Sequence, residues 1–141
     1  MFDPNVIASV NFALQNAVEG GTGISARVSG YDIAGKTGTT DDNKSAWFAG
    51  YSNSLTAVVM MMKQDANGNP ISLNGTGGLG SVTGGSFPAR IFAAFMKAAL
   101  AQFPSTPFIE PTATPSITAT PTESPTSTVT PEPSVTPTPS P

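Results

Sequence analysis

The chain has 141 residues with 14 Gly and 14 Pro but neither Cys nor His, and its formal net charge is −3. Without Cys and His, no disulfide, thiol nucleophile or imidazole base can form, which excludes a Ser-His-Asp triad and Cys- or His-based metal sites. The nearly balanced charge, with no basic cluster, also argues against nucleic acid as a partner. We therefore expect no metal and no cofactor.

The first predicted element is a helix that begins at Asp3 and Pro4, a good N-cap and a good first helical residue. Gly20 and Gly21 end it. Between these ends, apolar residues recur at helical spacing, at Val6, Ile7, Val10, Ala13, Leu14, Ala17 and Val18. One face of this helix is apolar and needs a covering partner.

The region from Gly23 to Gly38 carries a mixed signal. Its β-branched and aromatic residues favour strands, but glycines interrupt them. The pattern predicts short strands separated by a turn at Ser29-Gly30. A polar cluster at residues 41–44 predicts a second turn.

Two strand-like runs follow, over residues 45–51 and 55–62. The three polar residues between them, 52–54, are few enough to close an antiparallel hairpin. Every residue from Val58 to Met62 is apolar, as expected of a strand that is covered on both faces.

A polar, glycine-rich stretch from Gln64 to Gly85 predicts a loop, after which a second helix begins. Ser86 can cap this helix and Pro88 fits its first turn. Its apolar stripe consists of Ile91, Phe92, Phe95, Met96, Ala99, Leu100 and Phe103. Helix, three strands and helix together make an α+β unit.

The composition changes abruptly near Phe103. Residues 104–141 contain 11 of the 14 prolines together with 11 Thr and 6 Ser. They also carry the whole net charge, through Glu110, Glu123 and Glu132. Such a segment has too little apolar content to offset the entropy of ordering. We therefore divide the chain into a folded part, 1–103, and a disordered Pro/Thr/Ser-rich tail, 104–141, that buries nothing.

Two glycine-rich patterns suggest nucleotide binding, but their surroundings disagree. Residues 30–37 match the phosphate-loop pattern G-x-x-x-x-G-K-[ST], yet a turn follows Thr37 where such a loop needs a helix. Residues 75–80 match the dinucleotide pattern G-x-G-x-x-G, yet they lie in a long predicted loop. Gly84-Gly85 interrupts any helix that might follow. We favour neither interpretation.

A third pattern is Lys36-Thr37-Gly38-Thr39-Thr40, interpreted as an edge strand. An extended peptide could pair with the strand backbone, and Gly38 permits its close approach. The hydroxyls of Thr37 or Thr39 could bind a terminal carboxylate, and Lys36 adds positive charge beside a reacting centre. The pattern therefore predicts one wall of a peptide-acylation site.

Four blocks of sequence, in this order, resemble the C-terminal end of the transpeptidase domain of penicillin-binding proteins. They are Ala34–Thr40, Asp42–Lys44, Ala46–Tyr51 and Thr83–Ala89. The bifunctional class A type, within the serine β-lactamase/DD-peptidase superfamily, is the most similar. Together the blocks are far more specific than the Lys-Thr-Gly (KTG) triplet alone. The resemblance covers about residues 4–103.

The resemblance implies that a serine attacks the D-Ala-D-Ala bond of a peptidoglycan stem peptide and that a neighbouring peptide amine resolves the acyl-enzyme into a cross-link. It also implies acylation by β-lactams. The implied catalytic residues are Lys36, which assists proton transfer, and Thr39, whose backbone N–H completes an oxyanion hole. The implied substrate-binding residues are Thr37, Gly38, Thr39 and Thr40, with Thr37 and Thr39 binding the carboxylate.

The implied fold is a partial β-lactamase/transpeptidase-like fold, an antiparallel sheet with the N- and C-terminal helices packed on one face. Two strands and a helical lobe would be missing, so apolar surface would be exposed. The parent protein would work outside the cytoplasm, in the cell envelope, and be anchored in the membrane. No apolar run reaches about 18 residues, and residues 1–20 lack the basic start and unbroken apolar stretch of a signal peptide, so we expect no export signal in this chain.

The chain departs from the family pattern because it contains no Ser-x-x-Lys. The Ser-x-Asn motif is lacking too, since Ser52-Asn53-Ser54 does not fit it and follows Lys36 instead of preceding it. We therefore expect the C-terminal part of a serine D,D-transpeptidase, inactive alone, that binds stem peptides and β-lactams only with the missing upstream part. The alternative is a non-catalytic docking module on a cell-wall-spanning stalk.

Overall fold

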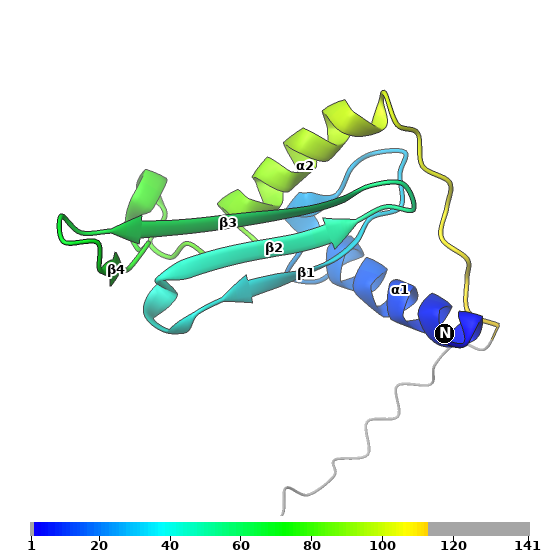
Figure 1. The fold of residues 1–141 in the computed structure, drawn as a ribbon, viewed down its shortest axis with the longest axis horizontal. Coiled ribbons are helices and arrows are strands. Elements are labelled where there is room, and N and C mark those ends of the chain that lie inside the picture. The colour runs from blue at the N-terminus through cyan, green and yellow to red at the C-terminus, as the bar shows by residue number, and fades with distance from the viewer. Residues whose placement is uncertain (1, 113–141) are drawn as a thin grey trace, which may run out of the picture.

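The computed structural model describes residues 2–112, so the predicted disorder of residues 113–141 lies outside the described residues. The helices and strands are α1 (Pro4–Glu19), β1 (Ala34–Thr39), β2 (Ser45–Tyr51), β3 (Thr56–Gln64), β4 (Pro70–Ile71) and α2 (Phe87–Leu100). The strands form one antiparallel sheet in the order β1-β2-β3-β4, with the two helices beside it (Figure 1). The predicted α+β class is confirmed.

Helix α1 begins and ends as its sequence predicts. The Asp3 carboxylate accepts a hydrogen bond from the Asn5 N–H at 2.8 Å, and Pro4 is the first helical residue. At the other end, a Cβ on Gly21 would lie 2.8 Å from the Ala17 carbonyl oxygen. Only glycine allows the chain to turn that closely past the last turn of the helix.

The strands predicted between residues 23 and 33 are wrong. Ile24–Ala26 forms a single 3₁₀ turn, and the only strand of this region is β1. Ala26, Val28 and Ile33 are nevertheless buried in the main hydrophobic core. Their apolar character therefore reflects core contact by an irregular segment and not the alternation of a strand.

The predicted antiparallel hairpin of β2 and β3 is confirmed, and so is the turn predicted at residues 41–44. Strand β2 has the predicted ends, and the Ser52 hydroxyl closes its turn to β3 by accepting hydrogen bonds from the N–H groups of Ser54 and Leu55 at 3.2 Å. The turn between β1 and β2 places Asp42 and Asn43 at φ 56° and 54°. Asn and Asp tolerate this left-handed backbone better than other non-glycine residues.

One face of the sheet, called the closed face, carries Phe48 and is covered by α2. The rings of Phe48 and Phe92 lie 4.8 Å apart, and Met96 and Leu100 continue the same buried stripe of α2 at intervals of four residues. Ala46, Leu73 and Val82 form a second, smaller core. The predicted stripe is only partly buried, because Ile91, Phe95 and Phe103 are exposed.

The opposite face, called the open face, carries Trp47, Val58, Met60 and Met62, all of them exposed. Along β3 their neighbours Ala57, Val59 and Met61 are half-buried. The prediction that β3 is covered on both faces is therefore wrong for the part of the chain that the structure describes. Helix α2 covers one face only, and side chains alternate between the faces. The exposed apolar surface implied by the resemblance is present here.

Helix α1 contributes to the same core as α2 through Val18, which is fully buried with Phe48 and Phe92. Its middle also reaches Tyr51, whose hydroxyl donates a hydrogen bond to the Asn11 side-chain oxygen at 2.7 Å. Burial raises the pKa of the Tyr51 phenol above its usual value. The first helix thus packs beside β1, joins the core at its C-terminal end, and contacts the end of β2 through Asn11.

The chain after α2 packs on the folded body as far as residue 112, returning to the start of α1 (Figure 1). The Phe108 ring is buried edge-on against Tyr51 at 5.6 Å, and the Phe108 N–H donates to the Asp32 carboxylate at 3.1 Å. The Thr112 N–H donates to the Asn5 side chain at 2.8 Å. The prediction that nothing beyond Phe103 is buried is therefore wrong for Phe108, an aromatic residue within a segment of otherwise tail-like composition.

Candidate functional site

Strand β1 lies at the end of the sheet, so only one side of its backbone is paired with a strand of the described chain. The Thr40 N–H donates to the Ser45 carbonyl at 3.0 Å, and the register then pairs Gly38 with Trp47 and Lys36 with Ala49. Backbone groups of successive residues point to opposite sides of a strand. The N–H and C=O groups of Thr37 and Thr39 therefore point away from β2, along what we call the free edge.

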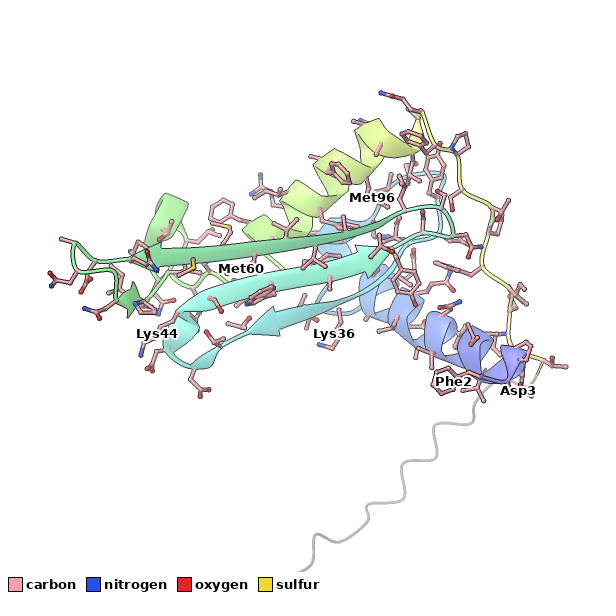
Figure 2. The ribbon with its side chains drawn as sticks, in the orientation of Figure 1. Phe2, Asp3, Lys36, Lys44, Met60 and Met96 are labelled. Atoms are coloured by element: carbon pink, nitrogen blue, oxygen red, sulfur yellow. The ribbon has the colours of Figure 1, made fainter. Side chains whose placement is uncertain are left out.

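The Lys36 side chain is exposed and leaves β1 clear of α2 (Figure 2). Its ammonium donates to the Thr37 carbonyl oxygen at 3.2 Å and lies 3.5 Å from the Thr37 hydroxyl. Among residues 2–112 the ion pairs are Arg27–Glu19 and Lys44–Asp42, so the Lys36 ammonium faces no carboxylate there. The free edge therefore carries an uncompensated positive charge.

The Thr37 hydroxyl lies 2.8 Å from the hydroxyl of Thr22, which belongs to the loop after α1. Thr22 is not among the residues predicted from the sequence. The signal that could have found it is its place within Gly20-Gly21-Thr22-Gly23, where glycines on both sides permit close packing. The contact joins two segments that are 15 residues apart in sequence.

Thr39 is held by the loop that precedes α2. The Gly84 N–H donates to the Thr39 hydroxyl oxygen at 3.2 Å. A Cβ on Gly84 would lie 2.0 Å from the Trp47 carbonyl oxygen and 2.8 Å from that of Gly38, so no larger residue fits without movement. A Cβ on Gly85 would lie 2.2 Å from the Thr22 carbonyl oxygen. Gly84 and Gly85 therefore allow the loop before α2 to pack directly against β1 and the Thr22 loop.

The other two predicted substrate residues have different surroundings. Gly38 pairs with Trp47 of β2, and a Cβ on Gly38 would lie 3.4 Å from the Trp47 Cβ. Because Gly38 has no side chain, nothing projects from β1 at this position. Thr40 follows the end of β1, and its hydroxyl accepts a hydrogen bond from the Ser45 N–H at 2.8 Å. Thr40 therefore closes the turn at one end of the free edge.

The candidate site is an open strand edge and not a closed pocket. A hollow of about 600 Å³ lies elsewhere, between Glu19, Arg27 and the loop at residues 28–32. Within the described range, no cluster of three or more acidic side chains has the spacing to hold a metal ion. None of the helices in this range is long and apolar enough to cross a membrane.

Comparison with known proteins identifies one family. Residues 1–97 match the family model of the penicillin binding protein transpeptidase domain. Penicillin-binding protein 1A of Rickettsia typhi is 35% identical over 99 residues, which are 70% of this chain and 11% of that protein. Penicillin-binding protein 1B of Vibrio cholerae is 30% identical over 105 residues, 73% of this chain and 12% of the relative.

A shorter stretch is more strongly similar. Penicillin-binding protein 1A of Neisseria flavescens is 55% identical over 47 residues, which are 32% of this chain and 6% of that protein. The chain therefore spans about a tenth or less of the length of these relatives.

Proposed function

Because the chain belongs to the penicillin-binding protein transpeptidase domain family, we propose that the free edge of β1 is the strand wall of a D,D-transpeptidase site. The site would cross-link peptidoglycan stem peptides and be acylated by β-lactams. The observation that carries the proposal is the direction of the Thr37 and Thr39 backbone groups, which leaves a strand edge open to an extended peptide. The Lys36 ammonium at this edge supports it.

We propose for each predicted residue the role that the family resemblance implies. The Thr39 N–H points out from the free edge and is the proposed oxyanion-hole donor, since a fixed N–H stabilises charge that develops in the transition state. Lys36 favours loss of the proton from a nucleophilic serine placed beside it and stabilises nearby negative charge. The hydroxyls of Thr37 and Thr39 bind the substrate carboxylate. Gly38 lets the peptide backbone approach, and Thr40 closes the end of the wall.

The serine nucleophile must come from outside this sequence, because none of its serines is followed by Lys three positions later. We propose that residues upstream in a longer protein supply the Ser-x-x-Lys and Ser-x-Asn motifs. That protein would act outside the cytoplasm in the cell envelope, anchored in the membrane. The relatives are long enough to contain such a region, since the matched segment is 11% of the Rickettsia typhi protein.

The proposal is tested by labelling with a fluorescent penicillin. The 141-residue chain should remain unlabelled. The chain extended upstream by its own coding sequence should be labelled covalently, because the extension restores the nucleophile. Lys36→Ala in the extended protein should slow labelling about 100-fold, in the range expected for loss of a group that assists proton transfer.

The matched control is Lys44→Ala, which removes an exposed lysine that pairs with Asp42 outside the free edge. Labelling of this variant should match that of the unmodified protein. An extended protein that binds no penicillin would contradict the proposed function. Equal labelling of the Lys36→Ala and Lys44→Ala variants would contradict the role given to Lys36.

A further inference from the structure

We propose that Thr22 is a positioning residue for the free edge: it holds the Thr37 hydroxyl so that its proton points toward a bound carboxylate. The proposal deepens the proposed function and rests on it. It starts from the 2.8 Å contact between the two hydroxyls and from the position of Thr22 on a loop outside the sheet.

The direction of the hydrogen bond is certain for the neighbouring hydroxyl, that of Thr39. An N–H can only donate, so the Gly84 N–H fixes the Thr39 hydroxyl oxygen as an acceptor at 3.2 Å. The Thr39 proton then points away from Gly84. One of the two hydroxyls on this strand is thereby set to donate to an incoming anion.

The Thr37 hydroxyl is likewise free to donate its proton to an anion when the Thr22 hydroxyl donates to the Thr37 oxygen. The Lys36 ammonium, 3.5 Å from the Thr37 hydroxyl oxygen, also can only donate and favours that oxygen as an acceptor. A hydroxyl that donates to a carboxylate makes a bond about twice as strong as one to a neutral oxygen. With a carboxylate bound, the lowest-energy arrangement is therefore Thr22 donating to Thr37 and Thr37 donating to the anion.

The backbone around Thr22 is fixed by glycines and not by the hydroxyl contact itself. A Cβ on Gly23 would lie 3.0 Å from the Ala17 carbonyl oxygen, and one on Gly85 would lie 2.2 Å from the Thr22 carbonyl oxygen. The loop is thus held between the end of α1 and the segment before α2. The Thr22 hydroxyl can be removed without removing the contacts that place the loop, which makes its role separable from the fold.

The test is a titration of the ¹⁵N-labelled upstream-extended protein with N-acetyl-D-Ala-D-Ala, followed by amide chemical shifts of β1. The matched ligand is the C-terminal amide of the same peptide, which lacks the carboxylate. Thr22→Val should raise the Kd for the free acid about 5-fold, the effect of losing one hydrogen bond, and leave the Kd for the amide unchanged. Thr22→Ser should restore binding of the acid.

A double variant distinguishes positioning of the Thr37 hydroxyl from a general destabilisation of the loop. If Thr22 acts through Thr37, Thr22→Val should have no further effect in a Thr37→Val background. The inference is overturned if Thr22→Val leaves acid binding unchanged, weakens acid and amide equally, or adds to Thr37→Val. If the upstream-extended protein without these substitutions shows no shifts in β1 with the acid, the carboxylate site of the proposed function fails together with the inference.

Discussion

The two faces of the sheet both carry apolar side chains, but they differ in burial. On the closed face, Phe48 meets Phe92 of α2 and both are fully buried. On the open face, Val58 and Met60 of β3 remain 57% and 43% exposed. The apolar residues of a strand indicate how much surface can be buried. The position of the covering helix determines which face of the sheet is buried. Exposed apolar faces of this kind occur at interaction surfaces and also favour aggregation.

The largest effect should come from removing an aromatic ring from the closed face. Phe92→Ala should lower the free energy of unfolding by about 4 kcal/mol, because it removes buried surface and leaves a cavity beside Phe48. Phe95→Ala, on the exposed side of the same helix, should change it by less than about 1 kcal/mol. Urea unfolding followed by circular dichroism measures both. Equal losses would mean that α2 buries a different side from the one described.

A somewhat smaller loss of stability is expected from a substitution in the loop before α2, which packs against β1. Gly84→Ala should cost about 3 kcal/mol, since the added Cβ would lie 2.0 Å from the Trp47 carbonyl oxygen and must displace the loop. Gly80→Ala is the matched control, because a Cβ there meets nothing within 4 Å. Thermal unfolding of the two variants compares them directly. A Gly84→Ala protein as stable as Gly80→Ala would contradict the close packing of this loop on β1.

Sequence patterns predicted the elements whose signals are local. Asp3 and Pro4 mark the start of α1 through the backbone groups next to them, and the polar residues 52–54 mark the turn between β2 and β3. The irregular segment at 24–33 was not predicted, because its apolar residues serve a core assembled from distant elements. The apolar run of β3 did not predict its open face for a related reason: apolar residues at every position do not reveal on which side α2 lies.

The candidate site shows the same limit. The KTG strand was predicted because its chemistry lies within five consecutive residues. Its supports were not, because Thr22 and Gly84 are 15 and 45 residues away from their partners Thr37 and Thr39. Phe108 was missed because the proline-rich composition around it outweighs one aromatic residue, although that residue is buried against Tyr51.

Whether β1 presents an unpaired edge can be measured by amide hydrogen exchange. Within this single strand, the N–H groups of Lys36 and Gly38 pair with β2, whereas those of Thr37 and Thr39 point away from it. We expect slow exchange at Lys36 and Gly38 and much faster exchange at Thr37 and Thr39. Exchange at Thr37 and Thr39 as slow as at Gly38 would show that the edge is already occupied and would rule out a free edge.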